Sequence, residues 1–160
     1  MLQILTILIL MLAAPVAAIA IEAMTTGGSL IALAGKWFVF FFGLRLLLAG
    51  FYQLTKPDFT AKTIFRNTDP NAMKIVSELG FGNIAIGALG VLTIVNATWI
   101  VPAAIVMAIF YALAGAKHVM NAERTASETW ALWSDLLAAL VLVGWLLVGR
   151  LNNALLTFQA

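Results

Sequence analysis

Four ionisable side chains stand inside apolar stretches of this chain. Arg45, Glu78, His118 and Asp135 belong to four separate stretches, and the amide of Asn83 lies close to Glu78 in sequence. An ionisable group within a membrane span is costly and usually faces a partner or a cavity. At a rise of about 1.5 Å per helical residue, all five lie in the same half of their spans. We therefore expect one polar site, with Arg45 paired to Glu78 or Asp135 and His118 bridging carboxylates.

Such a site can pass protons or hold a small polar or anionic head group. A histidine beside a carboxylate changes protonation near neutral pH, which suits proton transfer. The alternative is that side chains near helix ends merely extend their charged tips into the interface. Lys36 lies nine residues from Arg45 and therefore on the opposite face of the same helix, outside the site. Lys36 and Glu22 lie toward the other side of the membrane and can pair there.

The composition excludes several kinds of site. The chain has no cysteine, which rules out disulfides, iron–sulfur clusters and thiolate metal sites. Its one histidine excludes a bis-histidine haem or a multi-histidine metal site within one chain. The glycine run Gly80–Asn83 follows no strand, so we interpret it as backbone packing and not as a phosphate site. We expect no metal, no cofactor and no catalytic residue, and the scattered basic residues indicate no nucleic-acid partner.

The elements that must position these residues are membrane helices. The chain is 63% hydrophobic and 10% charged, whereas a soluble domain is about 25% charged. A helical span needs about 20 apolar residues, so residues 1–160 are predicted to form one all-α domain of five spans. The expected spans cover about residues 2–23, 30–54, 73–95, 99–120 and 130–151. We interpret the first as a retained span and not a signal peptide, because it lacks a positive start and is too long.

Local signals refine the ends of these helices. Pro15 is expected to kink the first span, and Gly27-Gly28 to end it. Asp69 and Pro70 fit the N-cap and first position of the third helix. Thr125–Glu128 fits a capping box before the fifth. The segment 58–67 is expected to form one interfacial turn, with Phe59, Ile64 and Phe65 in lipid.

Basic residues gather in alternate loops and predict an orientation. The loops between spans one and two and between spans three and four hold no Lys or Arg. The other two loops and their edges hold Lys56, Lys62, Arg66, Lys74, Lys117 and Arg124. Because basic loops tend to stay in the cytoplasm, the N-terminus is predicted to be cytoplasmic and the C-terminus external. Arg150 is the one exception.

Small residues mark the expected helix contacts, since lipid supplies no hydrophobic drive for pairing. They suggest close packing with spans three and four near the centre, although a homodimer would give the same pattern. The residues are the ladder Ala104, Ala108, Ala112 and Ala116, the stripe Gly80, Asn83, Gly87 and Gly90, and the pair Gly43 and Gly50.

The run from Glu78 to Gly90 resembles a motif of an uncharacterised family of small multi-pass prokaryotic membrane proteins. That family is catalogued as a domain of unknown function and is loosely similar to the DoxX-like proteins. Gly115–His118 and Asp135–Leu137 also resemble it, and the similarity covers about residues 35–150. The family usually has Gly directly before the His, where this chain has Lys117. The resemblance implies a prokaryotic inner membrane and singles out Glu78, Asn83, His118 and Asp135, but it carries no known reaction.

Three classes of function compete. The leading one is an accessory or scaffold subunit or a small-ligand binder without catalytic chemistry, with the lipid bilayer and a homo-oligomer or larger membrane complex as partners. The alternative is a transporter or proton-handling protein that uses Arg45, Glu78, His118 and Asp135. The absence of an internal repeat disfavours a transporter. A membrane enzyme ranks last because few side chains are available to ligate a cofactor.

Overall fold

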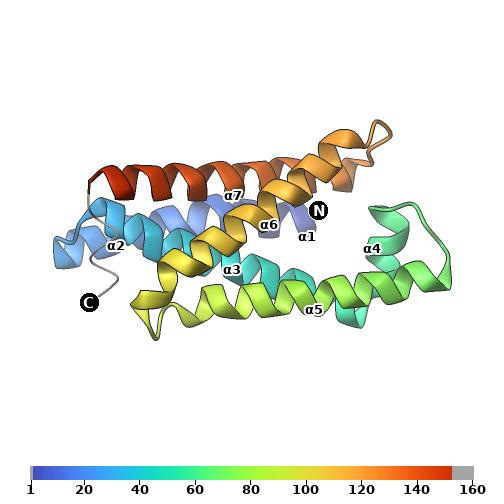
Figure 1. Cartoon of the computed structure of the whole chain (residues 1–160), viewed down its shortest axis with the longest axis horizontal. Coiled ribbons are helices and arrows are strands. Elements are labelled where there is room, and N and C mark those ends of the chain that lie inside the picture. Colours follow the sequence, from blue (N-terminus) through green and yellow to red (C-terminus); the bar gives the residue numbers. More distant parts are fainter. Residues whose placement is uncertain (1, 153–160) are drawn as a thin grey trace.

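The computed structural model describes residues 2–152, and this part of the chain is helical without strands (Figure 1). The elements in order are α1 (Leu2–Leu8), π-helix η1 (Ile9–Ala13), α2 (Ala14–Thr26), α3 (Leu30–Thr55), α4 (Pro57–Thr63), α5 (Pro70–Leu92), 3-10 helix η2 (Ala97–Trp99), α6 (Ile100–Met120) and α7 (Ala126–Leu151). Five helical stretches are long and apolar enough to cross a membrane: Ile4–Thr26, Leu30–Thr55, Pro70–Leu92, Ala97–Met120 and Ala126–Leu151. The all-α fold with five candidate spans is therefore confirmed.

The first span is interrupted where the sequence places its proline. Pro15 has no N–H to donate and its ring crowds the preceding turn. The helix widens into the π-helix Ile9–Ala13, in which the Ala14 N–H reaches back five residues to the Ile9 carbonyl. The span ends at Gly27, whose left-handed φ of 65° closes the helix with a bond to the Ala23 carbonyl.

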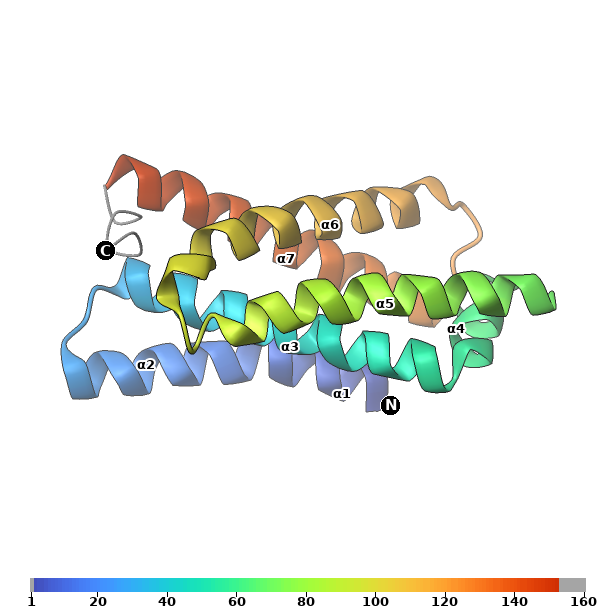
Figure 2. The ribbon, with the colours of Figure 1, turned by 60° about the horizontal axis from the view of Figure 1, so that its bottom comes forward.

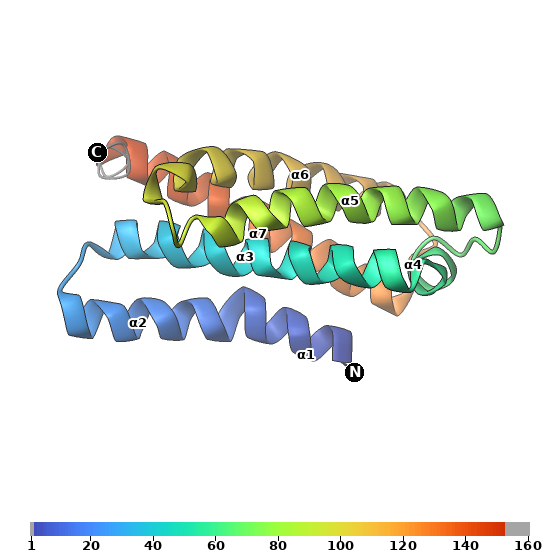
Figure 3. The same cartoon turned by 90° about the horizontal axis from the view of Figure 1, so that it is seen from below.

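Helix α3 lies at the centre of the bundle, in contact with α2, α5, α6 and α7. Figures 2 and 3 show α5 running along it over most of its length. The two backbones approach closely because glycines face each other. A Cβ on Gly43 would lie 2.7 Å from the Gly90 Cα, and a Cβ on Gly50 would lie 2.7 Å from the Gly80 carbonyl oxygen. The expectation that spans three and four form the centre is therefore wrong, because α3 is the second span.

The alanine ladder of α6 is only half used inside the bundle. Ala104 and Ala108 are buried, whereas Ala112 and Ala116 are exposed. In Figures 1 and 2, α6 and α5 separate toward the α4 end of the bundle. There α6 packs on α7 through another residue, since a Cβ on Gly115 would lie 2.7 Å from a methyl carbon of Leu136. Within the described part of the chain, close packing therefore involves only Ala104 and Ala108, and contact of Ala112 and Ala116 with another helix stays a prediction.

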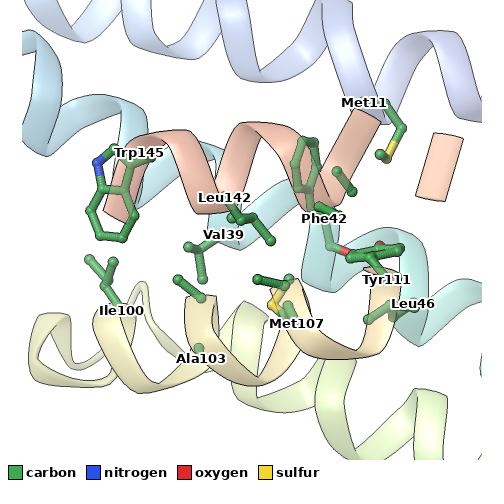
Figure 4. Close-up of a cluster of buried hydrophobic side chains, with 14 of the residues drawn as sticks. Met11, Val39, Phe42, Leu46, Ile100, Ala103, Met107, Tyr111, Leu142 and Trp145 are labelled. Atoms are coloured by element: carbon green, nitrogen blue, oxygen red, sulfur yellow. The ribbon is translucent and has the colours of Figure 1, made fainter. Parts of the chain in front are cut away.

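The fully buried core fills the space between α3, α6 and α7 (Figure 4). Phe42 and Tyr111 meet edge to face with ring centroids 6.2 Å apart. The Tyr111 hydroxyl donates to the Phe42 carbonyl oxygen at 2.9 Å, which satisfies a polar atom in an apolar region. This contact fixes α6 against α3 one turn from Arg45.

The predicted helix starts are confirmed. Asp69 accepts a hydrogen bond from the Asn71 amide at 2.8 Å, with Pro70 in the first helical position. The Thr125 hydroxyl accepts from the Glu128 amide at 3.0 Å. The segment expected at the interface contains the short helix α4, which Figure 3 shows nearly end-on while the long helices lie in the page.

Candidate functional site

A buried ion pair joins α3 to α7. Nη2 of Arg45 lies 3.0 Å from Oδ1 of Asp135 and donates to the Ser134 hydroxyl at 2.7 Å. The side chains of Arg45 and Asp135 are only 14% and 8% exposed. The guanidinium also lies 5.3 Å from the Tyr111 ring centroid, within the range of a cation–π contact. Ten residues separate Arg45 from the end of α3, so the pair lies about 15 Å inside the helix.

His118 continues this contact from α6. Its Nε2 lies 3.8 Å from Oδ2 of Asp135, and its Nδ1 lies 3.0 Å from Oε1 of Glu128. Glu128 and Asp135 are seven residues apart on α7, two turns along one face. The imidazole therefore stands between two carboxylates of the same helix. The shorter contact is a hydrogen bond, while the longer one is too wide for direct bonding.

Glu128 is a site residue that the sequence interpretation missed. The capping box assigned its carboxylate to the start of α7, where it does accept from the Thr125 backbone N–H. Both oxygens also accept from Asn121 Nδ2 at 2.9 Å, and one meets His118. The Glu128 side chain is 4% exposed. The signal that would have found it is its spacing of seven residues from Asp135, which places both acids on one face. Arg124 closes this end of the site by donating to the His118 and Asn121 carbonyls.

We call Arg45, Asp135, His118 and Glu128 the polar chain. It runs from the α6–α7 loop to the middle of the bundle, and each of its side chains lies next to another member. With a neutral His118 the four side chains carry one positive and two negative charges. With a protonated His118 the charges sum to zero. The arrangement can therefore take up one proton and become neutral overall.

Glu78 is not part of the polar chain, although we expected it as a partner of Arg45. Its side chain is exposed, and within residues 2–152 it forms no ion pair or hydrogen bond. The reason is the register of α5 against α3. The Gly80 backbone lies against Gln53 and Leu54, in the last turn of α3, so Glu78 is level with the end of that helix. The estimated depth of Glu78 in the membrane was therefore too large.

Asn83 is buried, but at the α3–α5 interface. Its Nδ2 donates to Oε1 of Gln53 at 2.7 Å. Its Oδ1 is buried without a hydrogen-bond partner in the described part of the chain. The structure thus brings together Arg45, His118 and Asp135, while Glu78 and Asn83 lie apart from them.

A second ion pair stands near the opposite end of α3. Lys36 Nζ lies 2.7 Å from Glu22 Oε1, and the Trp37 indole donates to the same carboxylate at 2.7 Å. The Lys36 and Glu22 side chains are 31% and 23% exposed. The expected pairing of Lys36 with Glu22 is therefore present, and it ties the first span to α3.

Within residues 2–152 no group of three His, Asp or Glu side chains is placed to hold a metal ion. Comparison with known proteins gives one finding, a family model described as "Family of unknown function (DUF6790)", which matches residues 1–154. No curated protein and no solved structure matches the chain. The finer likeness to DoxX-like proteins and the prokaryotic origin stay predictions.

Proposed function

Because this chain belongs to the DUF6790 family of unknown function, its activity must be argued from its own side chains, and we propose that it is a proton-handling multi-pass membrane protein. The membrane is the prokaryotic inner membrane, with the N-terminus in the cytoplasm. The basic residues in the loops next to α4 and at the end of α6 support this orientation. Glu128 then stands at the cytoplasmic end of the polar chain and Arg45 near the middle of the membrane.

The position of His118 between Glu128 and Asp135 carries the proposal. A proton accepted at one ring nitrogen can leave from the other, so the imidazole is able to connect the two carboxylates. The gap of 3.8 Å to Asp135 is wide enough to need a water or a small ring movement. Arg45 holds the Asp135 carboxylate in place from α3.

The polar chain ends at Arg45. Beyond it, toward the outer end of the bundle, the space between α3, α6 and α7 is filled by apolar side chains such as Val39, Leu142 and Ile100. A proton that enters from the cytoplasm therefore leaves by the same route unless the helices rearrange. This favours proton binding coupled to a conformational change over an open path across the membrane.

The chain has a single histidine, which gives a direct test. Histidine-selective isotope labelling followed by NMR in detergent reports on His118 alone. Replacing a neighbouring acid removes a negative charge that favours the protonated ring. Glu128→Gln also removes the carboxylate oxygen that lies 3.0 Å from Nδ1 of His118, so it should change how the ring signals of His118 respond to pH. Glu78→Gln is the matched control and should leave that response unchanged, because Glu78 is exposed and lies apart from the polar chain. Equal behaviour of both variants would remove the support for a shared proton site.

Orientation has its own test. Reporter fusions at Asn71, before α5, and at Asn96, after it, should report opposite sides of the membrane, with Asn71 in the cytoplasm. A cytoplasmic signal at Asn96 would contradict the proposed direction.

A second candidate is the role of accessory or scaffold subunit, or of small-ligand binder. The exposed half of the alanine ladder, Ala112 and Ala116, favours a subunit role. Small residues on a membrane helix permit close approach of another helix, and nothing within the described part of the chain covers these two. Mass measurement in mild detergent tests this candidate, and a clean monomer without a co-purifying chain would count against it.

A further inference from the structure

The helix α4 lies across the end of the bundle, between the last turn of α3 and the start of α5 (Figures 1 and 3). Its neighbours are two spans, so the membrane surface passes at this level. We propose that α4 and its flanking residues form a binding surface for the head groups of anionic phospholipids. We call this surface, made of Lys56, Phe59, Lys62, Arg66 and Lys74, the α4 basic surface.

One side of α4 is buried while its aromatic residue stays outside. Thr60 and Ala61 pack against the bundle and are 4% and 0% exposed. Phe59 is 39% exposed, and its ring rests edge-on against Tyr52 with centroids 5.3 Å apart. Tyr52 is itself 41% exposed on the last turns of α3. An aromatic pair that is half outside the fold at the end of a span suits the boundary between acyl chains and head groups.

Lys56 lies beside this aromatic pair, and Lys62 and Arg66 follow Phe59 on α4 and just after it. Nζ of Lys56 is 5.7 Å from the Tyr52 ring centroid. Lys62 lies 3.5 Å from Asp58, with both side chains about half exposed, and Arg66 lies 3.6 Å from Glu123, which is 87% exposed. Exposed ion pairs of this kind contribute about 0–1 kcal/mol. The three cations therefore remain available to a stronger anion such as a lipid phosphate.

The positive charge of the α4 basic surface and its position at the end of a span both favour an anionic phospholipid as its ligand. An anionic phospholipid has a phosphate that can bind the cations and an acyl chain that can contact Phe59. The surface places these two kinds of side chain next to each other. Each basic residue near an anionic membrane contributes about 1 kcal/mol, so removing two lysines should weaken the preference for anionic over zwitterionic lipid about thirtyfold. This expectation does not depend on the polar chain or on proton binding.

The test compares lipid retention by the full chain in detergent micelles that contain equal amounts of phosphatidylglycerol and phosphatidylcholine. Native mass spectrometry measures which lipid remains bound. The variant is Lys56→Gln/Lys62→Gln. The matched control is Arg150→Gln, an exposed cation in the last turn of α7 at the other end of the bundle.

The wild-type chain and the Arg150→Gln control should both retain phosphatidylglycerol preferentially, and the double variant should lose that preference. Circular dichroism should show all three equally helical, because neither lysine is buried. A wild-type chain that retains both lipids equally would overturn the proposal. So would a double variant with an unchanged preference, or a control that loses it equally. Inorganic phosphate at the same concentration as the lipid should leave retention unchanged, and equal displacement by phosphate would overturn the assignment of this surface to a whole phospholipid.

Discussion

Replacing Arg45 with methionine is the sharpest perturbation of the polar chain. Methionine keeps much of the apolar stem but removes the charge, so Asp135 loses its ion-pair partner at 3.0 Å. His118 then remains as its nearest base, at 3.8 Å. The exposed fractions of 14% and 8% make this a buried pair. Breaking such a pair from one side typically costs about 3–5 kcal/mol, because the other charge stays buried without compensation.

The loss should appear as a lower melting temperature. For a chain of this size about 1 kcal/mol shifts the melting temperature by about 2–4 °C, so Arg45→Met should lower it by about 6–20 °C. Thermal unfolding in mild detergent, followed by circular dichroism, measures this shift. Lys36→Met is the matched control. Its partner Glu22 is 23% exposed and keeps the Trp37 indole, so the loss should be about 1 kcal/mol or less.

A double-mutant cycle identifies the partner. Asp135→Asn in the Arg45→Met background removes the orphaned carboxylate, and it should restore part of the lost stability with a coupling of about 0.5–3 kcal/mol. Glu78→Gln in the same background should restore nothing, since Glu78 is exposed and level with the end of α3. Strictly additive losses for Arg45 and Asp135, or rescue by Glu78→Gln, would refute the assignment of Asp135 as the partner.

Three further predictions concern packing and helix ends, each measured by the same thermal unfolding. Gly87→Ala should destabilise by about 1–3 kcal/mol because its Cβ would lie 2.7 Å from the Gly43 carbonyl oxygen, whereas Gly82→Ala has open space and should stabilise α5 by about 0.5–1 kcal/mol. Ala108→Leu should cost about 1–3 kcal/mol, while Ala112→Leu on the exposed part of the ladder should be tolerated. Thr125→Ala should lower the stability by about 1 kcal/mol because the N-cap of α7 is lost. A Gly82→Ala variant less stable than Gly87→Ala, or an Ala112→Leu variant less stable than Ala108→Leu, would contradict the packing assignments. An unchanged Thr125→Ala variant would contradict the N-cap assignment.

The spans could be predicted from the sequence because their signals are local. An apolar run of sufficient length, a proline and a capping residue each act within a single helix, so Asp69 and Pro70 mark the start of α5 without reference to the rest of the fold. Small residues carry less information. A small residue such as Gly43 or Ala112 permits another helix to approach closely, but it does not specify which of the other helices packs there. The glycines of α3 and α5 meet, whereas only the first half of the α6 ladder, Ala104 and Ala108, is buried inside the bundle.

The polar chain shows the same division between local and global information. Sequence alone left Glu78 and Asp135 as equal candidates for Arg45, because both estimated depths were similar. The contact of Gly80 with the last turn of α3 places Glu78 level with the end of that helix, a register that the apolar pattern alone does not show. The pairing with Asp135 follows from α3 facing α7, which no single-helix signal specifies.

Glu128 was nevertheless within reach of a simple argument. The loop from Asn121 to Thr125 has five residues, and a short loop makes neighbouring helices antiparallel. The last turn of α6 must then face the first turn of α7, so His118 is level with Glu128 and Tyr111 is level with Asp135. The capping assignment hid this relation, because it assigns the Glu128 carboxylate to the Thr125 backbone N–H, although that hydrogen bond leaves both carboxylate oxygens able to accept from further donors. A buried carboxylate beside the end of an adjacent helix requires a partner, and His118 and Asn121 are the groups that the hairpin geometry places there.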